Sequence, residues 1–159
     1  MSSEPYSFRQ EHWVQRPIRE VFSFFSDARN LEQITPPWLR FRILSMSTES
    51  IQEGTEICYR LRLRGVPIHW RTEILEWNPP CRFVDVQRSG PYKLWRHAHE
   101  FEAEDGGTRM ADKVDYALPF GLLGRIAHAL IVRRDVQSIF DYRRQQIDAL
   151  FGEQRGSTK

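Results

Sequence analysis

The sequence of 159 residues predicts an α+β fold in which a seven-stranded antiparallel sheet, two short helices and a long C-terminal helix form one domain. Three observations support this fold class. Apolar residues alternate with a period of two through most of residues 39–118, turn sequences divide that region into short strands, and helical spacing begins after residue 119. We expect the domain to span residues 1–152 and the polar segment 153–159 to form a flexible tail.

The N-terminal part is expected to contain one strand and two short helices. The strand spans residues 6–14, and Pro17 is suited to begin the first helix because its fixed φ matches helical geometry. Asp27 can cap a second short helix that ends before Pro36. The apolar residues at helical spacing are Ile18, Val21, Phe22, Phe25, Leu31 and Ile34.

Six further strands follow, separated by turn sequences rich in Gly and Pro. Because these connections are short, we expect consecutive strands to pair in antiparallel fashion. The expected strands are residues 41–46, 55–64, 68–77, 82–88, 93–103 and 108–118.

A long amphipathic helix is expected after Gly121. Its apolar stripe would pack against the concave face of the sheet, because no other surface is large enough to bury it. Arg143 lies beside the stripe, where it would extend its guanidinium into solvent, the preferred interpretation, or reach into a cavity beneath the helix. The stripe comprises Leu123, Ala127, Leu130, Val136, Phe140, Ile147 and Phe151.

The composition limits the classes of partner. The formal net charge of +2 is too small to indicate a polyanionic partner, so no nucleic-acid binding is expected. No apolar run approaches the length of a membrane helix and the N-terminal residues contain no apolar signal core, so we expect a cytoplasmic protein without stable membrane insertion. Cys58 and Cys81 lack a metal-binding spacing and are expected to be reduced.

Alternation places two histidines and an aspartate on one face of adjacent strands. His97 and His99 point to the same face of their strand, and Asp112 points to that face from the next one. A turn over residues 104–107 sets His99 opposite Asp112, close enough for a hydrogen bond. The neighbouring residues are mostly apolar, which predicts a polar cluster inside an apolar cavity with walls formed by Tyr59, Trp70, Phe83, Trp95, Phe101, Met110 and Tyr116.

The cluster of His97, His99 and Asp112 has four interpretations. Its members could bond only to each other and fix the strand pair, or they could anchor the polar end of an apolar ligand. They also match a facial triad in ligand type, and His99 with Asp112 could transfer protons. We expect no metal and no cofactor. Asp85 shares the face of Phe83 and, if buried, needs a partner.

The order of elements and several local motifs resemble the START-like, or SRPBCC, superfamily and its helix-grip fold. More narrowly, the chain resembles a bacterial branch of uncharacterised ligand-binding members. The resemblance runs over nearly the whole chain and is carried by Trp77-Asn78-Pro79-Pro80, Phe83 with Asp85, Gly90-Pro91-Tyr92, Trp95-x-His97-x-His99-x-Phe101, Gly107-Thr108-x-Met110-x-Asp112, Tyr116-x-Leu118-Pro119-x-Gly121 and Phe140-x-Tyr142-Arg143. It implies binding of a lipid, quinone or polyketide-like molecule between the sheet and the long helix.

We therefore expect a protein, either monomer or homodimer, that binds a small hydrophobic ligand rather than an enzyme. One alternative is an enzyme of the cyclase, aromatase or hydratase type that uses His99 and Asp112. Another is an interaction module that presents the outer sheet face, rich in arginine, to a protein or a membrane. The expected ligand-binding residues are Tyr59, Trp70, Phe83, Trp95, His97, His99, Phe101, Met110, Asp112, Tyr116 and Arg143.

Overall fold

The structure is a computed structural model that describes residues 4–152. Its seven strands form one antiparallel sheet in the order β1-β7-β6-β5-β4-β3-β2, which confirms the predicted fold class. The expected strands differ from the observed ones only at their ends, and the expected tail 153–159 lies outside the described residues. The strands are β1 (Tyr6–Val14), β2 (Arg42–Met46), β3 (Glu56–Leu63), β4 (Val66–Asn78), β5 (Arg82–Ser89), β6 (Leu94–Glu104) and β7 (Gly107–Ala117).

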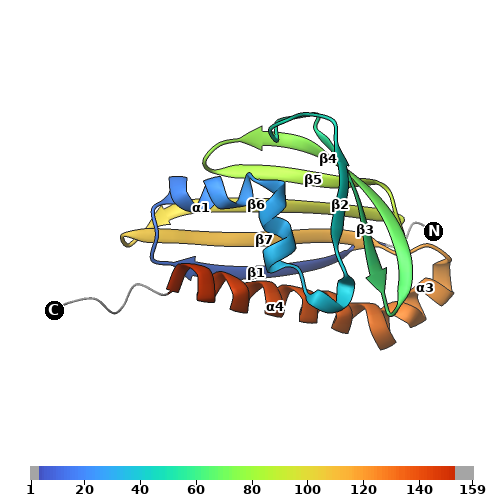
Figure 1. Cartoon of the computed structure of the whole chain (residues 1–159). Helices are drawn as coiled ribbons and strands as arrows, with labels where there is room; N and C mark the ends of the chain where they lie inside the picture. Colours follow the sequence, from blue (N-terminus) through green and yellow to red (C-terminus); the bar gives the residue numbers. More distant parts are fainter. Residues whose placement is uncertain (1–3, 153–159) are drawn as a thin grey trace.

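The helices lie on one side of the sheet and at its ends. Figure 1 shows the long helix α4 running the length of the molecule, with α1 at one end and α3 at the other. Within residues 4–152, no helix combines the length and the apolar character that crossing a membrane requires. The helical segments are α1 (Ile18–Phe25), η1 (Ala28–Asn30), α2 (Leu31–Ile34), η2 (Pro37–Leu39), α3 (Gly121–Ala127), η3 (His128–Val132) and α4 (Arg133–Gly152).

The β6–β7 hairpin has the predicted register. His99 pairs with Asp112 and Ala103 with Thr108, although the turn itself is shorter than expected. Glu104 already pairs with Gly107, which leaves a two-residue turn of Asp105 and Gly106, both with positive φ. A turn of this kind matches the twist of the flanking strands, so it holds the register that brings the histidines beside the aspartate.

Aromatic rings fill the concave face at the end of the molecule near α1. Phe22 of α1 packs edge-on against Phe83 and Phe101, with ring centroids 6.0 and 5.4 Å away. Phe25 and Ile147 belong to the same buried cluster, so α1, α4 and the sheet pack together there.

The predicted apolar stripe of the C-terminal helix is wrong in its first half. Val136, Phe140, Ile147 and Phe151 are buried, but Leu123 and Leu130 are 72% and 67% exposed. At about 100° per residue, Leu123 and Leu130 do not share a face with Val136 even in an uninterrupted α-helix.

The π-helical turn η3 places one additional residue in the helix between α3 and α4 and so decides which residues face the sheet in its first half. The inward side of the first half is therefore formed by Gly124 and His128 instead of by leucines. A Cβ at position 124 would collide with the Pro119 carbonyl, and the His128 ring stacks on Tyr6 at 3.4 Å between centroids.

Candidate functional site

An apolar cavity of about 190 Å³ lies between the sheet and α4. Its walls come from the end of α1, from β3, β4, β5, β6 and α4, and from the segment between α1 and β3. Seven of the predicted ligand-binding residues line it, namely Tyr59, Trp70, Phe83, Trp95, His97, His99 and Arg143. Its other walls are mainly aliphatic and aromatic and include Phe25, Leu31, Leu39, Phe41, Ile57, Leu61, Leu63, Ile74, Tyr92, Val136, Ile139 and Phe140.

The polar part of the cavity wall contains two imidazoles, each of which pairs with a carboxylate. His97 Nε2 lies 2.8 Å from Asp112 Oδ1, and His99 Nε2 lies 2.9 Å from Asp85 Oδ2. The expected close hydrogen bond between His99 and Asp112 is replaced by a longer approach of 3.4 Å from Nδ1. Although the two residues are opposite in register, the imidazoles lean along the strand and bond diagonally.

Asp85 is the polar residue that the sequence interpretation left without a role. It pairs in register with His97, bonds to His99 and accepts a hydrogen bond of 3.3 Å from Thr72. Its position on the same face as Phe83 was the signal that identified it as a buried carboxylate in need of a partner. Thr72 was missed, although it shares a face with Trp70 at a spacing of two.

Burial and charge set the ionisation of this cluster. Burial alone would raise the pKa of Asp112, but the Arg143 charge and hydrogen bonds from both histidines outweigh it and hold that pKa well below its usual value. The pKa of Asp85 is likewise lowered, because His99, His97 and Arg143 outweigh its burial. Burial and the neighbouring His99 lower the pKa of His97, despite its hydrogen bond to Asp112. The cluster therefore contains two carboxylates and a neutral His97.

Arg143 reaches into the cavity, so the preferred expectation that its guanidinium extends into solvent is wrong. Its Cζ lies 5.2 Å from the Phe25 ring centroid and 5.9 Å from that of Phe140, which gives it two cation–π contacts. Nε and Nη2 are buried and have no hydrogen-bond partner among residues 4–152. The same is true of Trp70 Nε1, and Trp70 also lines the cavity. The cavity thus contains N–H donors that need acceptors.

Four of the predicted ligand-binding residues do not line the cavity. Phe101 and Met110 lie in the filled cluster beneath α1, because α1 covers that end of the sheet. Tyr116 lies beneath η3, where its hydroxyl bonds to His128 Nε2 at 2.8 Å. Asp112 does not line the cavity itself but contacts both imidazoles that do, so its role is to hold them.

Asp85, His97 and His99 could supply three donor atoms to a metal ion, since these atoms lie within 4.8 Å of one another. Two histidines and one carboxylate also match a facial triad in ligand type. Both imidazoles, however, already bond to carboxylates, and the Arg143 charge acts on the same group. The hydrogen bonds and the nearby positive charge favour a hydrogen-bonded cluster over a cation site.

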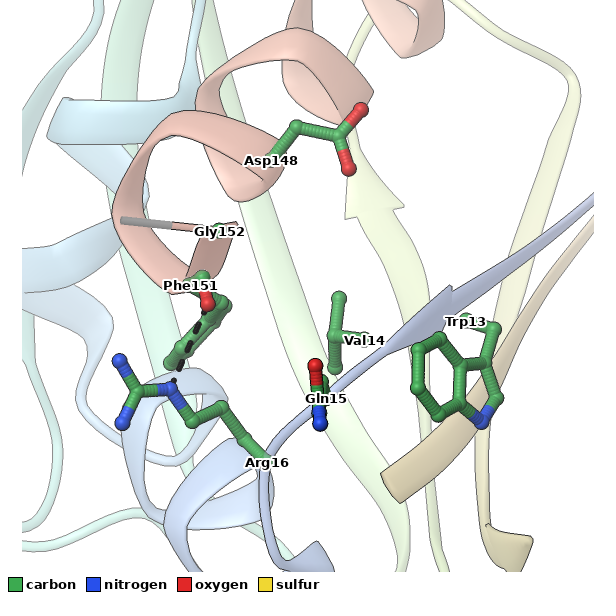
Figure 2. Close-up of a pocket in the computed structure, with 7 residues that line it drawn as sticks. All are labelled: Trp13, Val14, Gln15, Arg16, Asp148, Phe151 and Gly152. Carbon is green, nitrogen blue, oxygen red and sulfur yellow. Dashed lines mark hydrogen bonds between the residues drawn. The ribbon is translucent and has the colours of Figure 1, made fainter. Parts of the chain in front are cut away.

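A second hollow, of about 420 Å³, lies between the end of β1 and the end of α4 (Figure 2). Arg16 Nε donates to the Phe151 carbonyl at 3.4 Å, while Asp148 lies on the far side of the hollow from Arg16. Among the residues that the structure describes, those lining this hollow include no group of interacting acids and bases comparable to the two histidine–aspartate pairs. The apolar cavity is therefore the candidate site.

Solved structures with the same fold share little sequence identity with this chain. Protein Ms6760 from Mycobacterium smegmatis is 17% identical, with 94% of this chain and 97% of that chain covered and a TM-score of 0.67. Protein CV1439 from Chromobacterium violaceum is 13% identical, with 91% and 96% covered and a TM-score of 0.71. Major latex-like protein 151 from Panax ginseng is 10% identical, with 94% and 99% covered and a TM-score of 0.69. Such likeness establishes the helix-grip fold alone.

A search of curated proteins gives no match. The model of one protein family, described as polyketide cyclase / dehydrase and lipid transport, matches residues 14–141. This span runs from the end of β1 into α4 and contains almost all of the cavity wall. The family and the fold together support a hydrophobic ligand-binding scaffold. The chain belongs to the polyketide cyclase / dehydrase and lipid transport family.

Proposed function

We propose that the protein binds a small, mainly apolar molecule that presents a neutral acceptor oxygen, such as a ketone or phenol oxygen, to Arg143. The observation that carries the proposal is the pair of buried, unpartnered donors of Arg143 in an otherwise apolar cavity. A buried charged donor without an acceptor costs free energy, and a ligand that supplies the acceptor recovers it.

The volume of the cavity limits the size of the ligand. An engineered apolar cavity of about 150 Å³ in another protein binds benzene. The cavity here has a volume of about 190 Å³, so it can hold a molecule with a single ring or with two fused rings while the protein keeps this conformation. Trp70 and Trp95 are perpendicular to each other, with centroids 5.4 Å apart, and offer flat surfaces to such rings.

Charge favours a neutral oxygen over a carboxylate. Asp85 and Asp112 are ionised, since the pKa of each is lowered, and Arg143 is the nearby permanent cation that acts on both. A ligand carboxylate would add a third negative charge to this poorly solvated group. A carbonyl or phenol oxygen accepts from the guanidinium without adding charge.

The test compares two ligands that differ only in one oxygen. Isothermal titration calorimetry measures the affinity of 1-tetralone, a bicyclic ketone, and of tetralin, which lacks the oxygen. We expect 1-tetralone to bind about tenfold or more tightly, as a hydrogen bond from a charged donor predicts. Arg143→Met keeps the apolar stem and should abolish the difference, whereas Arg144→Met, on the exposed neighbour, should preserve it.

Equal affinities of the natural chain for tetralin and 1-tetralone would contradict the proposal. So would a preference for the ketone that persists in Arg143→Met. Native mass spectrometry of gently purified protein, followed by identification of any released compound, provides an independent check on ligand class.

A second candidate function is proton transfer, and the pair of His99 and Asp85 at 2.9 Å beside an apolar cavity favours it. This pair replaces the expected pair of His99 and Asp112 as acid and base. An enzyme of the cyclase or hydratase type would exchange the α-protons of bound 1-tetralone for deuterium, an exchange that NMR can follow. If His99→Asn still binds the ketone but no longer exchanges its α-protons, the result favours the enzyme. Exchange no faster than in buffer would favour binding alone.

A further inference from the structure

One end of the molecule exposes an unusual number of large apolar side chains. They come chiefly from α3, η3 and the residue before them, with Phe120 81%, Leu122 69% and Leu123 72% exposed. Ile126, Leu130 and Ile131 are exposed in the same segment. Scattered exposed apolar residues need no explanation, but a contiguous group on one helix marks a surface that contacts something apolar.

Two strand ends contribute to the same end of the molecule. Leu94, which begins β6, pairs with Ala117, which ends β7 just before α3. The turn between β3 and β4 lies at this end too, because Arg64 in that turn bonds through Nη2 to Asp135 at the start of α4, at 2.8 Å. Leu94 and Val66, the residue after this turn, are both exposed. We call this region the α3 end; Figure 1 shows α3 at the opposite end of the sheet from α1.

The orientation of α3 is fixed by its inward side. Gly124 packs against the Pro119 carbonyl, and His128 is held by stacking on Tyr6 and by its bond to the Tyr116 hydroxyl. These contacts leave the leucines on the outside.

The charges at the α3 end are almost all positive. Residues 118–134 contain Arg125, Arg133 and Arg134 and no Asp or Glu. The nearest acid after them, Asp135, is already paired with Arg64. An apolar helix face flanked only by arginines is typical of helices that lie in the interface of an anionic bilayer.

A hollow on the outer face of the sheet extends this positive charge. It measures about 530 Å³ and is lined by Arg40, Arg42, Arg60 and Arg62, together with Phe41 and Pro67. Arg42 and Arg60 are directly opposite in register, and none of the four arginines forms an ion pair within the part of the chain that the structure describes. Like charges placed opposite each other are unfavourable unless an anion lies between them. Arg60 and Arg62 precede the β3–β4 turn, so the hollow borders the α3 end.

We infer that the α3 end docks on an anionic lipid bilayer, with the leucines of α3 in the acyl boundary and the arginines among the headgroup phosphates. A second copy of the chain fits poorly, because a symmetric contact would bring the arginines of both copies together. The inference is independent of the ligand proposed for the cavity.

Flotation with vesicles tests the inference. The full chain should bind phosphatidylcholine vesicles that contain about one quarter phosphatidylglycerol, and bind pure phosphatidylcholine at least about tenfold more weakly. Higher salt should weaken the binding. The double variant Leu122→Ser/Leu123→Ser should lose on the order of tenfold in affinity, and Arg133→Ser/Arg134→Ser about fivefold or more.

Matched controls use exposed residues elsewhere. Leu44→Ser/Leu75→Ser removes two exposed leucines from the sheet, and Arg19→Ser/Arg144→Ser removes two exposed arginines, one from α1 and one from α4. Both should bind as the natural chain does. No binding to anionic vesicles overturns the inference, as does binding that the leucine variant retains. Self-association by analytical ultracentrifugation that the leucine variant abolishes, without vesicle binding, would assign the surface to a second copy instead.

Discussion

The two ends of the concave face share strands β5 and β6 and the helix α4, yet one end is filled and the other is hollow. At the α1 end, the Phe101 ring lies against the rings of Phe22 and Phe25, at centroid distances of 5.4 and 5.5 Å. Toward the α3 end, aromatic residues form walls around an open volume. The difference shows that the position of α1 determines where the cavity begins. The side chains of α1 occupy the space above the concave face of the sheet as far as Phe25 and Phe83.

The same comparison separates residues that support stability from residues that serve binding. Side chains in the filled end contact neighbours on all sides, whereas those around the cavity have one side free of protein atoms. The polar cluster lies between the two, with His99 stacked on Phe83 at 4.0 Å. Substitutions should therefore have different consequences at the two ends.

The largest effect is expected at the filled end. Phe101→Ala should lower the free energy of unfolding by about 3–5 kcal/mol, since the ring is buried and its neighbours cannot close the space. Ile139→Ala, which enlarges a hollow that already exists, should cost at most about 2 kcal/mol. Urea unfolding of both variants measures the difference. Equal losses would mean that the two ends are packed alike.

A smaller effect is expected from pH, through the cluster between the ends. The pKa of His97 is lowered in the fold by burial and by His99. As pH falls below about 6.5, this histidine therefore becomes protonated in the unfolded chain before it does so in the folded protein. The free energy of unfolding decreases over this range until the pH reaches the lower pKa of the folded state. The slope from this one proton is at most about 1.4 kcal/mol per pH unit. Asp85 and Asp112, whose pKa values are lowered, add losses only below about pH 3.9.

Unfolding midpoints between about pH 8 and pH 5 measure this dependence. Burial and the Arg133 charge lower the pKa of His128 too, so His128 acts in the same direction. Comparing His97→Asn with His128→Asn separates the two, and an NMR titration of the His97 ring in the natural chain gives the answer even if His97→Asn does not fold. A His97 that protonates at or above its ordinary pKa would contradict the assignment.

The sequence was sufficient to predict the strands and the register of β6 with β7, because alternation and one turn determine both. It was not sufficient to predict which imidazole bonds to which carboxylate. That choice depends on side chains leaning along the strand and on Asp85, which belongs to a neighbouring strand on the other side. The direction of Arg143 also depended on three-dimensional context, since a long side chain beside an apolar stripe can extend either way.

The π-helical turn η3 allows the number of residues at this point to differ by one between related chains. Each residue of an α-helix turns the next by about 100°, so an extra residue normally rotates everything beyond it to another face. Here the wider turn absorbs that residue, and Gly124 and His128 stay in line with Val136 on the sheet side. A relative shorter by one residue between positions 129 and 132 can close the turn into ordinary α-helix and keep the same side chains facing the sheet. A one-residue gap at this place in an alignment would therefore indicate a change from a π-helical turn to ordinary α-helix. The leucine face of α3 would keep its orientation.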